Sequence, residues 1–381
     1  MKTQTQTQAI AQFKQKRLDS LDILRGFTLF LLVFLQPILS SLGQSIQHPL
    51  YHKFLYHFQH ADWLGIHFWD MVMPLFLFMT GVAMPFSFKR YREQKDKVGV
   101  YKRILKRVVL LFLFGMIVQG NLLALDGQHL YLYTNTLQAI AVGYFIAALF
   151  QLHLSTRNQV FATLALLIIY AIPLMLHGDY SPEGNWAEKI DRLVLGRFRD
   201  GVYWTEDGAW HFAANYHYTW IWSSLTFGVT VMLGVLANKI VVTFKEIPTK
   251  VLKYLILTGV GLILVGLLWD LKLPIIKTIW TSSMALYTGG ICFLFLALFY
   301  YWIDVLGHKK GLNWLKVYGM NSILAYVLGM VVNFKCIGHS LFFGLEQYLG
   351  AYYGAWIVFV NYSILFAILY LLYKKNIFLR V

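Results

Sequence analysis

The sequence predicts an all-α, polytopic membrane protein with about ten transmembrane helices around a central channel. Of its 381 residues, 58% are hydrophobic and only 13% are charged, whereas soluble proteins carry about 25% charged residues. Apolar runs long enough to cross a bilayer recur from residue 21 to the C-terminus. Because no polar linker is long enough to separate two folded units, we expect a cytoplasmic segment over 1–20 and a single integral-membrane domain over 21–381.

The distribution of charge gives the expected topology. On the side of the N-terminus lie 25 of the 33 Lys and Arg residues, nine of them within residues 89–107. Under the positive-inside rule both termini face the cytoplasm, and the long loop at about 178–217 faces outward. The expected spans lie near 21–43, 66–88, 105–124, 136–153, 158–177, 218–240, 251–268, 282–304, 315–333 and 355–373.

Net charge and cysteine content argue against a nucleic-acid-binding protein and against a disulfide-rich protein. The net charge of +15 does not indicate nucleic-acid binding, because the basic residues collect in alternate loops, where topology and attraction to anionic membrane lipid account for them. Cys292 and Cys336 allow at most one bridge, so there is no disulfide framework. The first apolar run lacks a following cleavage site, and it should remain as the first span.

Ionisable side chains gather where the second span begins, in HADWLGIHFWDMVMPLFLFMTG. Such groups are expensive in hydrocarbon and usually serve a function there. His60 is suited to proton abstraction near neutral pH, and Pro74 can kink the helix beside a pocket. If the helix is continuous, His60 and Asp70 lie about 15 Å apart, so they should serve different depths of one cavity.

A metal site is a weaker interpretation of this region. Five histidines form a loose series, but the spacing matches no standard zinc pattern and there is no cysteine partner. The sequence therefore predicts no bound metal. The series consists of His48, His52, His57, His60 and His67.

Two polar groups near the span ends leave alternatives open. Asp22 and Arg25 are three residues apart, so on a helix they can pair, either as a snorkelling interfacial pair or as a pivot that lines a cytoplasmic cavity. Lys277, close to Trp280 in LPIIKTIWTSS, is either an interfacial Lys–Trp anchor or a cation beside the outer mouth.

Further polar groups are expected within the spans. Asn321 and Ser322 in YGMNSILAY either bond between helices or donate to a developing oxyanion. Arg103 and Arg107 lie four apart on one helical face and could hold a polyphosphate at the cytoplasmic mouth. The outer loop mixes aromatic rings with acids, which suits either an interfacial aromatic belt or carbohydrate stacking.

Several motifs, in order along nearly the whole chain from about residue 18, resemble the heparan-α-glucosaminide N-acetyltransferase family and its bacterial homologues, part of a transmembrane acyltransferase superfamily. They are LDSLDILRGFTLFLLVF, HADWLGIHFWDMVMPLFLFMTG, LPIIKTIWTSS, YGMNSILAYV and LYKKNIFLRV. The resemblance implies transfer of acetyl from cytoplasmic acetyl-CoA, held in a central cofactor channel, to an amino sugar on the far side of the membrane. It also implies that the histidine of the H-A-x-W-x-G motif, here His60, is catalytic.

The resemblance and the reasoning from residues together give a set of expected roles. We expect catalytic roles for His60, Gln36 and Asp70, with His60 as general base. Acetyl-CoA contacts are expected from Asp22, Arg25, Arg103, Arg107, Lys277, Asn321 and Ser322, and contacts to the carbohydrate acceptor from Asp62, Trp63 and Trp280.

Departures from the family concern mainly the acceptor side. Gln36 stands where the family often has asparagine, Ala139 stands where it usually has arginine, and the D-P-E-G-L segment before span six is replaced by NYHYTWIWSSLTFGVTVMLG. No N-x-S/T sequon lies in an outer loop, which favours a bacterial plasma (inner) membrane protein over a lysosomal one. A sugar O-acetyltransferase and a proton-coupled transporter of a sugar or lipid-linked intermediate remain alternatives, and a homodimer is left open.

Overall fold

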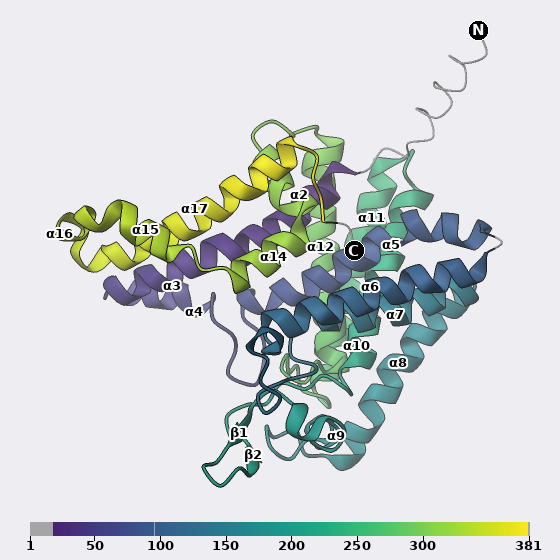
Figure 1. The fold of residues 1–381 in the computed structure, drawn as a ribbon. Coiled ribbons are helices and arrows are strands. Elements are labelled where there is room, and N and C mark those ends of the chain that lie inside the picture. The colour runs from purple at the N-terminus through teal and green to yellow at the C-terminus, as the bar shows by residue number, and fades with distance from the viewer. Residues whose placement is uncertain (1–17, 95, 380–381) are drawn as a thin grey trace.

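The computed structural model describes residues 18–94 and 96–379 and shows an almost wholly helical chain (Figure 1). Most of the expected segment 1–20 therefore lies outside the described residues. The helices of the first half are α2 (Asp19–Phe30), α3 (Gln36–Ser45), α4 (Pro49–Tyr56), α5 (Val72–Glu93), α6 (Lys97–Val118), α7 (Thr136–His153), α8 (Thr156–His177) and α9 (Trp186–Leu195). Those of the second half are α10 (Ser224–Thr243), α11 (Pro248–Asp270), α12 (Ser282–Phe299), α13 (Asn313–Met320), α14 (Ser322–Val331), α15 (Lys335–Phe342), α16 (Glu346–Leu349) and α17 (Tyr353–Lys374).

Shorter elements join or extend these helices. A π-helical segment at Leu31–Leu35 joins α2 to α3, and another at Tyr300–Val305 extends the end of α12. Turns of 3-10 helix lie at Phe68–Met71, Leu122–Ala124, Gly196–Phe198, Phe343–Leu345 and Gly350–Tyr352. In the outer loop, β1 (Val202–Trp204) pairs antiparallel with β2 (Trp210–Phe212). This hairpin and α9 gather at one end of the helical bundle (Figure 1).

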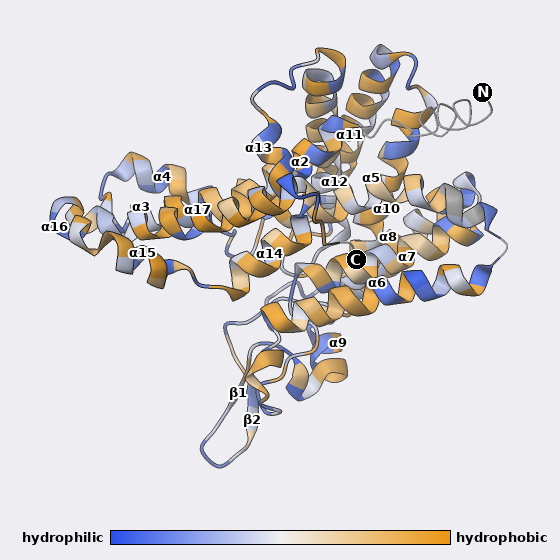
Figure 2. Ribbon diagram, turned by 45° about the horizontal axis from the view of Figure 1, so that its top comes forward, coloured by the Kyte–Doolittle hydropathy of each residue, from blue (hydrophilic) through white to orange (hydrophobic). Residues whose placement is uncertain are grey.

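The predicted all-α membrane fold is confirmed. By length and apolar composition, eight helices of the described chain could cross a membrane, and nine if a bent pair counts as one span. The expected span near 105–124 is α6, whose first half carries Lys102, Arg103, Lys106 and Arg107 and leaves a short uncharged stretch. Figure 2 shows hydrophobic residues along the long helices and hydrophilic ones at the α5–α6 turn.

The expected ninth span is broken at Asn321. α13 and α14 meet there at an angle of 77°, so Asn321 lies at a bend between two short helices and not inside a continuous span. Its side-chain nitrogen donates to the carbonyl of Ile377 (2.9 Å), and its oxygen accepts from the N–H of Leu379 (3.0 Å). Because Asn321 stands at the bend between the two helices, its amide can bond to the C-terminal tail and hold the tail against the break.

Helix α13 crosses α2 at very short range. A Cβ added at Gly26 would lie 1.8 Å from the carbonyl oxygen of Leu315, and one added at Gly319 would lie 2.0 Å from that of Asp22. Only glycine permits this backbone approach, as in other close-packed membrane helices. The crossing sets the position of the break that follows α13.

Candidate functional site

The carboxylate of Asp70 organises the loop that precedes α5. Its Oδ2 accepts hydrogen bonds from the backbone N–H groups of Ala61 (3.1 Å) and His67 (2.8 Å). Its Oδ1 lies 2.6 Å from Nδ1 of His60. The expectation that His60 and Asp70 serve different depths is wrong, because residues 57–67 are not helical and fold back over the start of the helix.

Lys277 reaches the same carboxylate from a distant part of the sequence. The loop around Gly65 pairs with the extended segment before α12, where the N–H of Gly65 donates to the carbonyl of Ile275 (2.8 Å). This pairing places the Lys277 ammonium 3.4 Å from Asp70 Oδ1 and 2.9 Å from His60 Nδ1. With a side chain only 8% exposed, Lys277 is not an interfacial anchor.

The chemistry of these three groups orients the imidazole. An ionised carboxylate only accepts and an ammonium only donates. Because Nδ1 of His60 is closer to Asp70 (2.6 Å) than to Lys277 (2.9 Å), Nδ1 carries its proton toward Asp70. Lys277 then directs its protons to Asp70 and to the hydroxyl of Tyr218 (3.1 Å) and not to Nδ1. Nε2 then holds the lone pair, and it is the nitrogen that can accept a proton, as in other carboxylate–histidine pairs.

These groups line an outer cavity of about 300 Å³. The outer cavity is built from loops and helix ends that the charge pattern predicts to lie on the outer side. Its polar lining residues are His60, Asp70, Gln119, Thr134, Asn135, Thr136, Asp200, Tyr216, Tyr218, Trp220, Lys277 and Tyr326.

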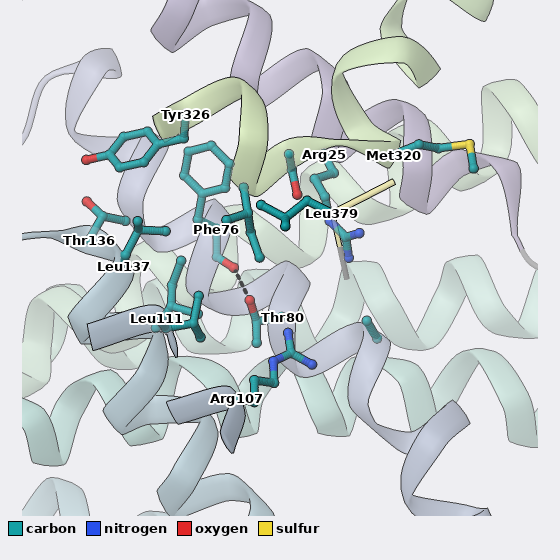
Figure 3. Close-up of a pocket in the computed structure, with 14 residues that line it drawn as sticks. Arg25, Phe76, Thr80, Arg107, Leu111, Thr136, Leu137, Met320, Tyr326 and Leu379 are labelled. Atoms are coloured by element: carbon teal, nitrogen blue, oxygen red, sulfur yellow. Dashed lines mark hydrogen bonds between the residues drawn. The ribbon is translucent and has the colours of Figure 1, made fainter. Parts of the chain in front are cut away.

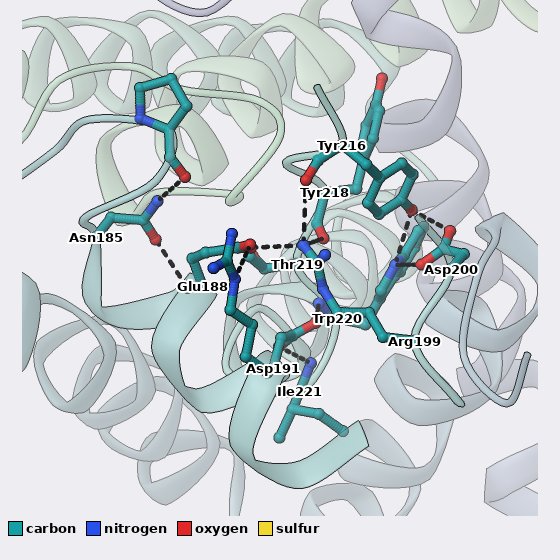
Figure 4. A network of polar contacts seen from close by, with 12 residues as sticks. Asn185, Glu188, Asp191, Arg199, Asp200, Tyr216, Tyr218, Thr219, Trp220 and Ile221 are labelled. Carbon is teal, nitrogen blue, oxygen red and sulfur yellow. Dashed lines mark hydrogen bonds and ion pairs between the residues drawn. The ribbon is translucent and has the colours of Figure 1, made fainter. Parts of the chain in front are cut away.

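The long outer loop supplies one wall of this cavity through a buried ion-pair network (Figure 4). Arg199 and Glu188 pair at 2.5 Å with both side chains fully buried. Arg199 also donates to the carbonyls of Tyr216 and Tyr218. The loop is therefore fixed against the bundle, which positions its aromatic side chains at the cavity.

Two carboxyl groups near this wall have raised pKa values. Asp191 accepts from the backbone N–H groups of Trp220 (2.7 Å) and Ile221 (2.9 Å). Asp200 accepts from the Tyr216 hydroxyl and, at 3.3 Å, from Nε1 of Trp220. Burial raises the pKa of each carboxyl to about 7, since desolvation outweighs the hydrogen bonds and the charge of Arg199.

An inner cavity of about 240 Å³ lies nearer the expected cytoplasmic side (Figure 3). Arg25, Arg107 and Ser322 line it, together with Leu379 from the C-terminal tail. Arg107 packs its guanidinium 4.4 Å from the ring centre of Tyr144, and its Nε is buried without a hydrogen-bond partner among the described residues. Two guanidinium groups on one cavity suit a phosphorylated ligand.

The two cavities are adjacent. Phe76, Thr136 and Tyr326 line both of them, and in Figure 3 Thr136 and Tyr326 lie together at one end of the inner cavity, away from Arg25. The lining therefore runs from two arginines at the inner end to the imidazole of His60 at the outer end.

Some expected site residues lie outside both linings. Arg103 is exposed and donates to the side chain of Gln94 (2.9 Å). The Gln36 amide donates to Ser40 and, more weakly, to the carbonyl of Phe58. Of Asp22 and Arg25, which were expected to pair in the first span, Arg25 lines the inner cavity, whereas Asp22 is largely buried and lies outside that lining.

The expected acceptor contacts are also elsewhere. Asp62 is exposed, and Trp63 donates to the carbonyl of Tyr180 (2.9 Å). Trp280 is 2% exposed and donates to Thr230 (3.2 Å). Its backbone takes a left-handed conformation (φ 53°) that completes the turn begun at Lys277. Because its ring is packed in the core, Trp280 does not line the cavity; its backbone instead shapes the turn that carries Lys277.

Sequence reasoning missed the residues that make the remaining walls. Asp200, Tyr216, Tyr218 and Trp220 come from the outer loop and the segment after it, for which only a general aromatic signal was visible. Thr134 to Thr136 stand where a helix begins, and the polar triplet is a helix-start signal that could have identified them. In the described part of the chain, no three His, Cys, Asp or Glu side chains come together as a metal site.

Comparison with known proteins relates the chain to one group of enzymes. Residues 17–181 match the model of a domain of unknown function, DUF5009. The human protein named heparan-alpha-glucosaminide N-acetyltransferase is 26% identical over 367 residues, which covers 82% of this chain and 52% of the human protein. The mouse protein of the same name is 24% identical over 365 residues, covering 82% of this chain and 53% of its own length.

The chain thus spans about half the length of the curated relatives it matches, and the similarity extends over most of this chain. It is distantly similar to the heparan-alpha-glucosaminide N-acetyltransferases of human and mouse.

Proposed function

We propose that this protein is a membrane acyltransferase that moves acetyl from cytoplasmic acetyl-CoA to a glucosamine-type amino sugar on the outer side. The observation that supports it best is that the inner cavity, with Arg25 and Arg107, adjoins the outer cavity, with His60, and shares three lining residues with it. The two guanidinium groups of the inner cavity suit a phosphorylated donor, and the aromatic rings, carboxyl groups and imidazole of the outer cavity suit an amino sugar.

In this proposal the donor enters from the inner end. Arg25 and Arg107 hold its phosphates, since guanidinium groups bind phosphate oxygens in a bidentate manner. The pantetheine arm extends past Phe76 and Tyr326, which line both cavities. The thioester then reaches the outer cavity beside His60.

Transfer needs a base and an oxyanion donor. The acceptor amine attacks the thioester carbonyl carbon and gives its proton to Nε2 of His60, whose tautomer Asp70 fixes. The Lys277 ammonium, close to the imidazole, donates to the tetrahedral oxyanion. Collapse breaks the carbon–sulfur bond, and the leaving thiolate takes the proton from the imidazolium. A hydroxyl acceptor would follow the same steps.

Replacement of the imidazole tests the assignment. We expect His60→Ala to reduce acetyl transfer to glucosamine by about 100-fold or more, the usual contribution of a positioned base, with acetyl-CoA binding unchanged. The measurement is turnover of radiolabelled acetyl-CoA by purified protein, beside equilibrium binding of the donor. His52→Ala is the matched control, because His52 is exposed and lies outside the cavities. Near-normal turnover by His60→Ala would refute the proposal.

A further inference from the structure

The outer cavity has a second polar group besides the His60–Asp70–Lys277 cluster. Asp200 lines the cavity and accepts from the Tyr216 hydroxyl through Oδ2 and from Trp220 Nε1 through Oδ1. Each oxygen of an ionised carboxylate has two acceptor positions. These two bonds use one position on each oxygen, and Asp200 lines the cavity from which a ligand could reach the other.

Aromatic rings surround this carboxyl. Trp220 stacks on Tyr133 (ring centres 5.4 Å apart, 29°) and on Tyr218 (6.2 Å, 20°), and Tyr216 lies 5.8 Å from Tyr218. Tyr216, Tyr218 and Trp220 all line the outer cavity. An apolar ring surface next to a few fixed acceptors is the usual composition of a small-molecule site.

A short series of contacts connects Asp200 with the reacting end. Lys277 Nζ lies 2.9 Å from His60 Nδ1 and donates to the Tyr218 hydroxyl at 3.1 Å. Tyr218 stacks on Trp220, which donates to Asp200. Asp200 thus lines the same cavity as the imidazole and is connected to it through Trp220, Tyr218 and Lys277.

We propose that Asp200 is the specificity-determining residue of a carbohydrate subsite, accepting hydrogen bonds from ring hydroxyls of the acceptor while Tyr218 and Trp220 form the apolar wall beside the sugar. The subsite rests on the proposed function, because it orients the acceptor of that reaction. Lys277 already neutralises Asp70. Asp200 is therefore the carboxyl available to a ligand, and a hydroxyl bound to it places the attacking group toward His60.

Equilibrium dialysis of purified protein without acetyl-CoA, at pH 8 where Asp200 with its pKa of about 7 is mostly ionised, tests the subsite independently of turnover. The probes are radiolabelled glucosamine and N-acetylglucosamine, which share ring hydroxyls but differ in the ammonium group. We expect Asp200→Asn to weaken binding of both sugars about tenfold or more, since a charge-assisted hydrogen bond is lost. Asparagine keeps the shape and can still accept from Trp220 and donate to the oxygen of Tyr216.

Asp207→Asn is the matched control, because Asp207 is exposed in the same loop and bonds only within its own turn. It should leave both sugar affinities unchanged, and acetyl-CoA affinity should be unchanged in both variants. Equal sugar binding by wild type and Asp200→Asn, or no binding by wild type, would overturn the subsite. A loss confined to glucosamine would show that Asp200 recognises the ammonium group and would also overturn it. Failure of acetyl transfer with intact, Asp200-dependent sugar binding would count against the proposed reaction alone.

Discussion

The side chain of Asp70 performs several structural tasks at once. The same carboxylate accepts from the N–H groups of Ala61 and His67, orients His60 and neutralises Lys277. The loop fold and the imidazole tautomer therefore depend on one group. This dependence explains why an acid can be kept fully buried at the start of an apolar helix.

Asp200 gives a prediction about pH at the same scale. Its pKa in the folded protein is raised to about 7, against about 4 in an unfolded chain. Between these values the folded protein holds a proton that the unfolded chain has released. The free energy of unfolding therefore falls as pH rises through this range. The charged or titratable groups around Asp200 are Tyr216, Arg199, Asp191 and Tyr131.

Thermal unfolding of the purified protein at pH 5 and pH 8 measures this effect. We expect a lower Tm at pH 8 for wild type and a smaller difference for Asp200→Asn, which cannot ionise. Asp191 has a similarly raised pKa, so part of the difference in Tm between pH 5 and pH 8 remains in Asp200→Asn. Asp207→Asn should behave as wild type, since hydrogen bonds lower the pKa of Asp207 out of this range. An identical pH dependence in Asp200→Asn would contradict the prediction.

At the scale of the elements, close helix crossings and breaks position the inner cavity. The α2–α13 crossing at Gly26 and Gly319 precedes the 77° bend at Asn321. Beyond the bend, Ser322 and Tyr326 reach the cavity lining from α14. The tail held by Asn321 adds Leu379 to the same lining. Asn321 thus acts on the cavity through the tail, because both ends of its amide bond to tail backbone.

Alanine at Gly319 tests the crossing. The added Cβ would overlap the carbonyl oxygen of Asp22, so we expect Gly319→Ala to destabilise the protein by about 1–3 kcal/mol, the usual cost of overpacking. Gly261→Ala is the control within a helix, because no atom lies within 4 Å of its Cβ position, and alanine there has the better helix propensity. Thermal unfolding compares the two variants, and equal Tm values would rule out a tight crossing.

At the scale of the whole molecule, two cavities share one lining through the bundle. The segment that departs from the family pattern, NYHYTWIWSSLTFGVTVMLG, is the one that brings Tyr216, Tyr218 and Trp220 to the outer cavity. The arginine end and the imidazole end belong to segments that the charge pattern predicts to lie on opposite sides of the membrane. Such an arrangement would allow donor and acceptor to be used from different compartments.

Proteoliposomes test this sidedness. With radiolabelled acetyl-CoA on the side of the arginines and glucosamine on the other, we expect labelled N-acetylglucosamine to accumulate on the acceptor side. Vesicles with both substrates on the acceptor side should form little product, because the donor cannot reach Arg25 and Arg107. Sugar uptake without acetylation would instead indicate a transporter, and product formation from either side would contradict a one-sided donor entrance.

The sequence by itself determined the class of fold and pointed to several residues that line the outer cavity. Hydropathy and charge patterning predict a polytopic helical protein because a bilayer requires long apolar spans with internally bonded backbones. Motif spacing singled out His60, Asp70 and Lys277. Their contact with one another could not be predicted, because it depends on a non-helical loop and on pairing between Gly65 and Ile275, 210 residues apart in the chain.

Only the tertiary structure decided which polar groups share a cavity. It brought Arg107 to the lining and left Arg103 exposed, although both lie on one face of α6. It placed Trp280 in the core and Asp200 at the outer cavity. Sequence patterns report local periodicity and composition, whereas a cavity is formed where distant segments fail to fill space, and that depends on how the helices cross.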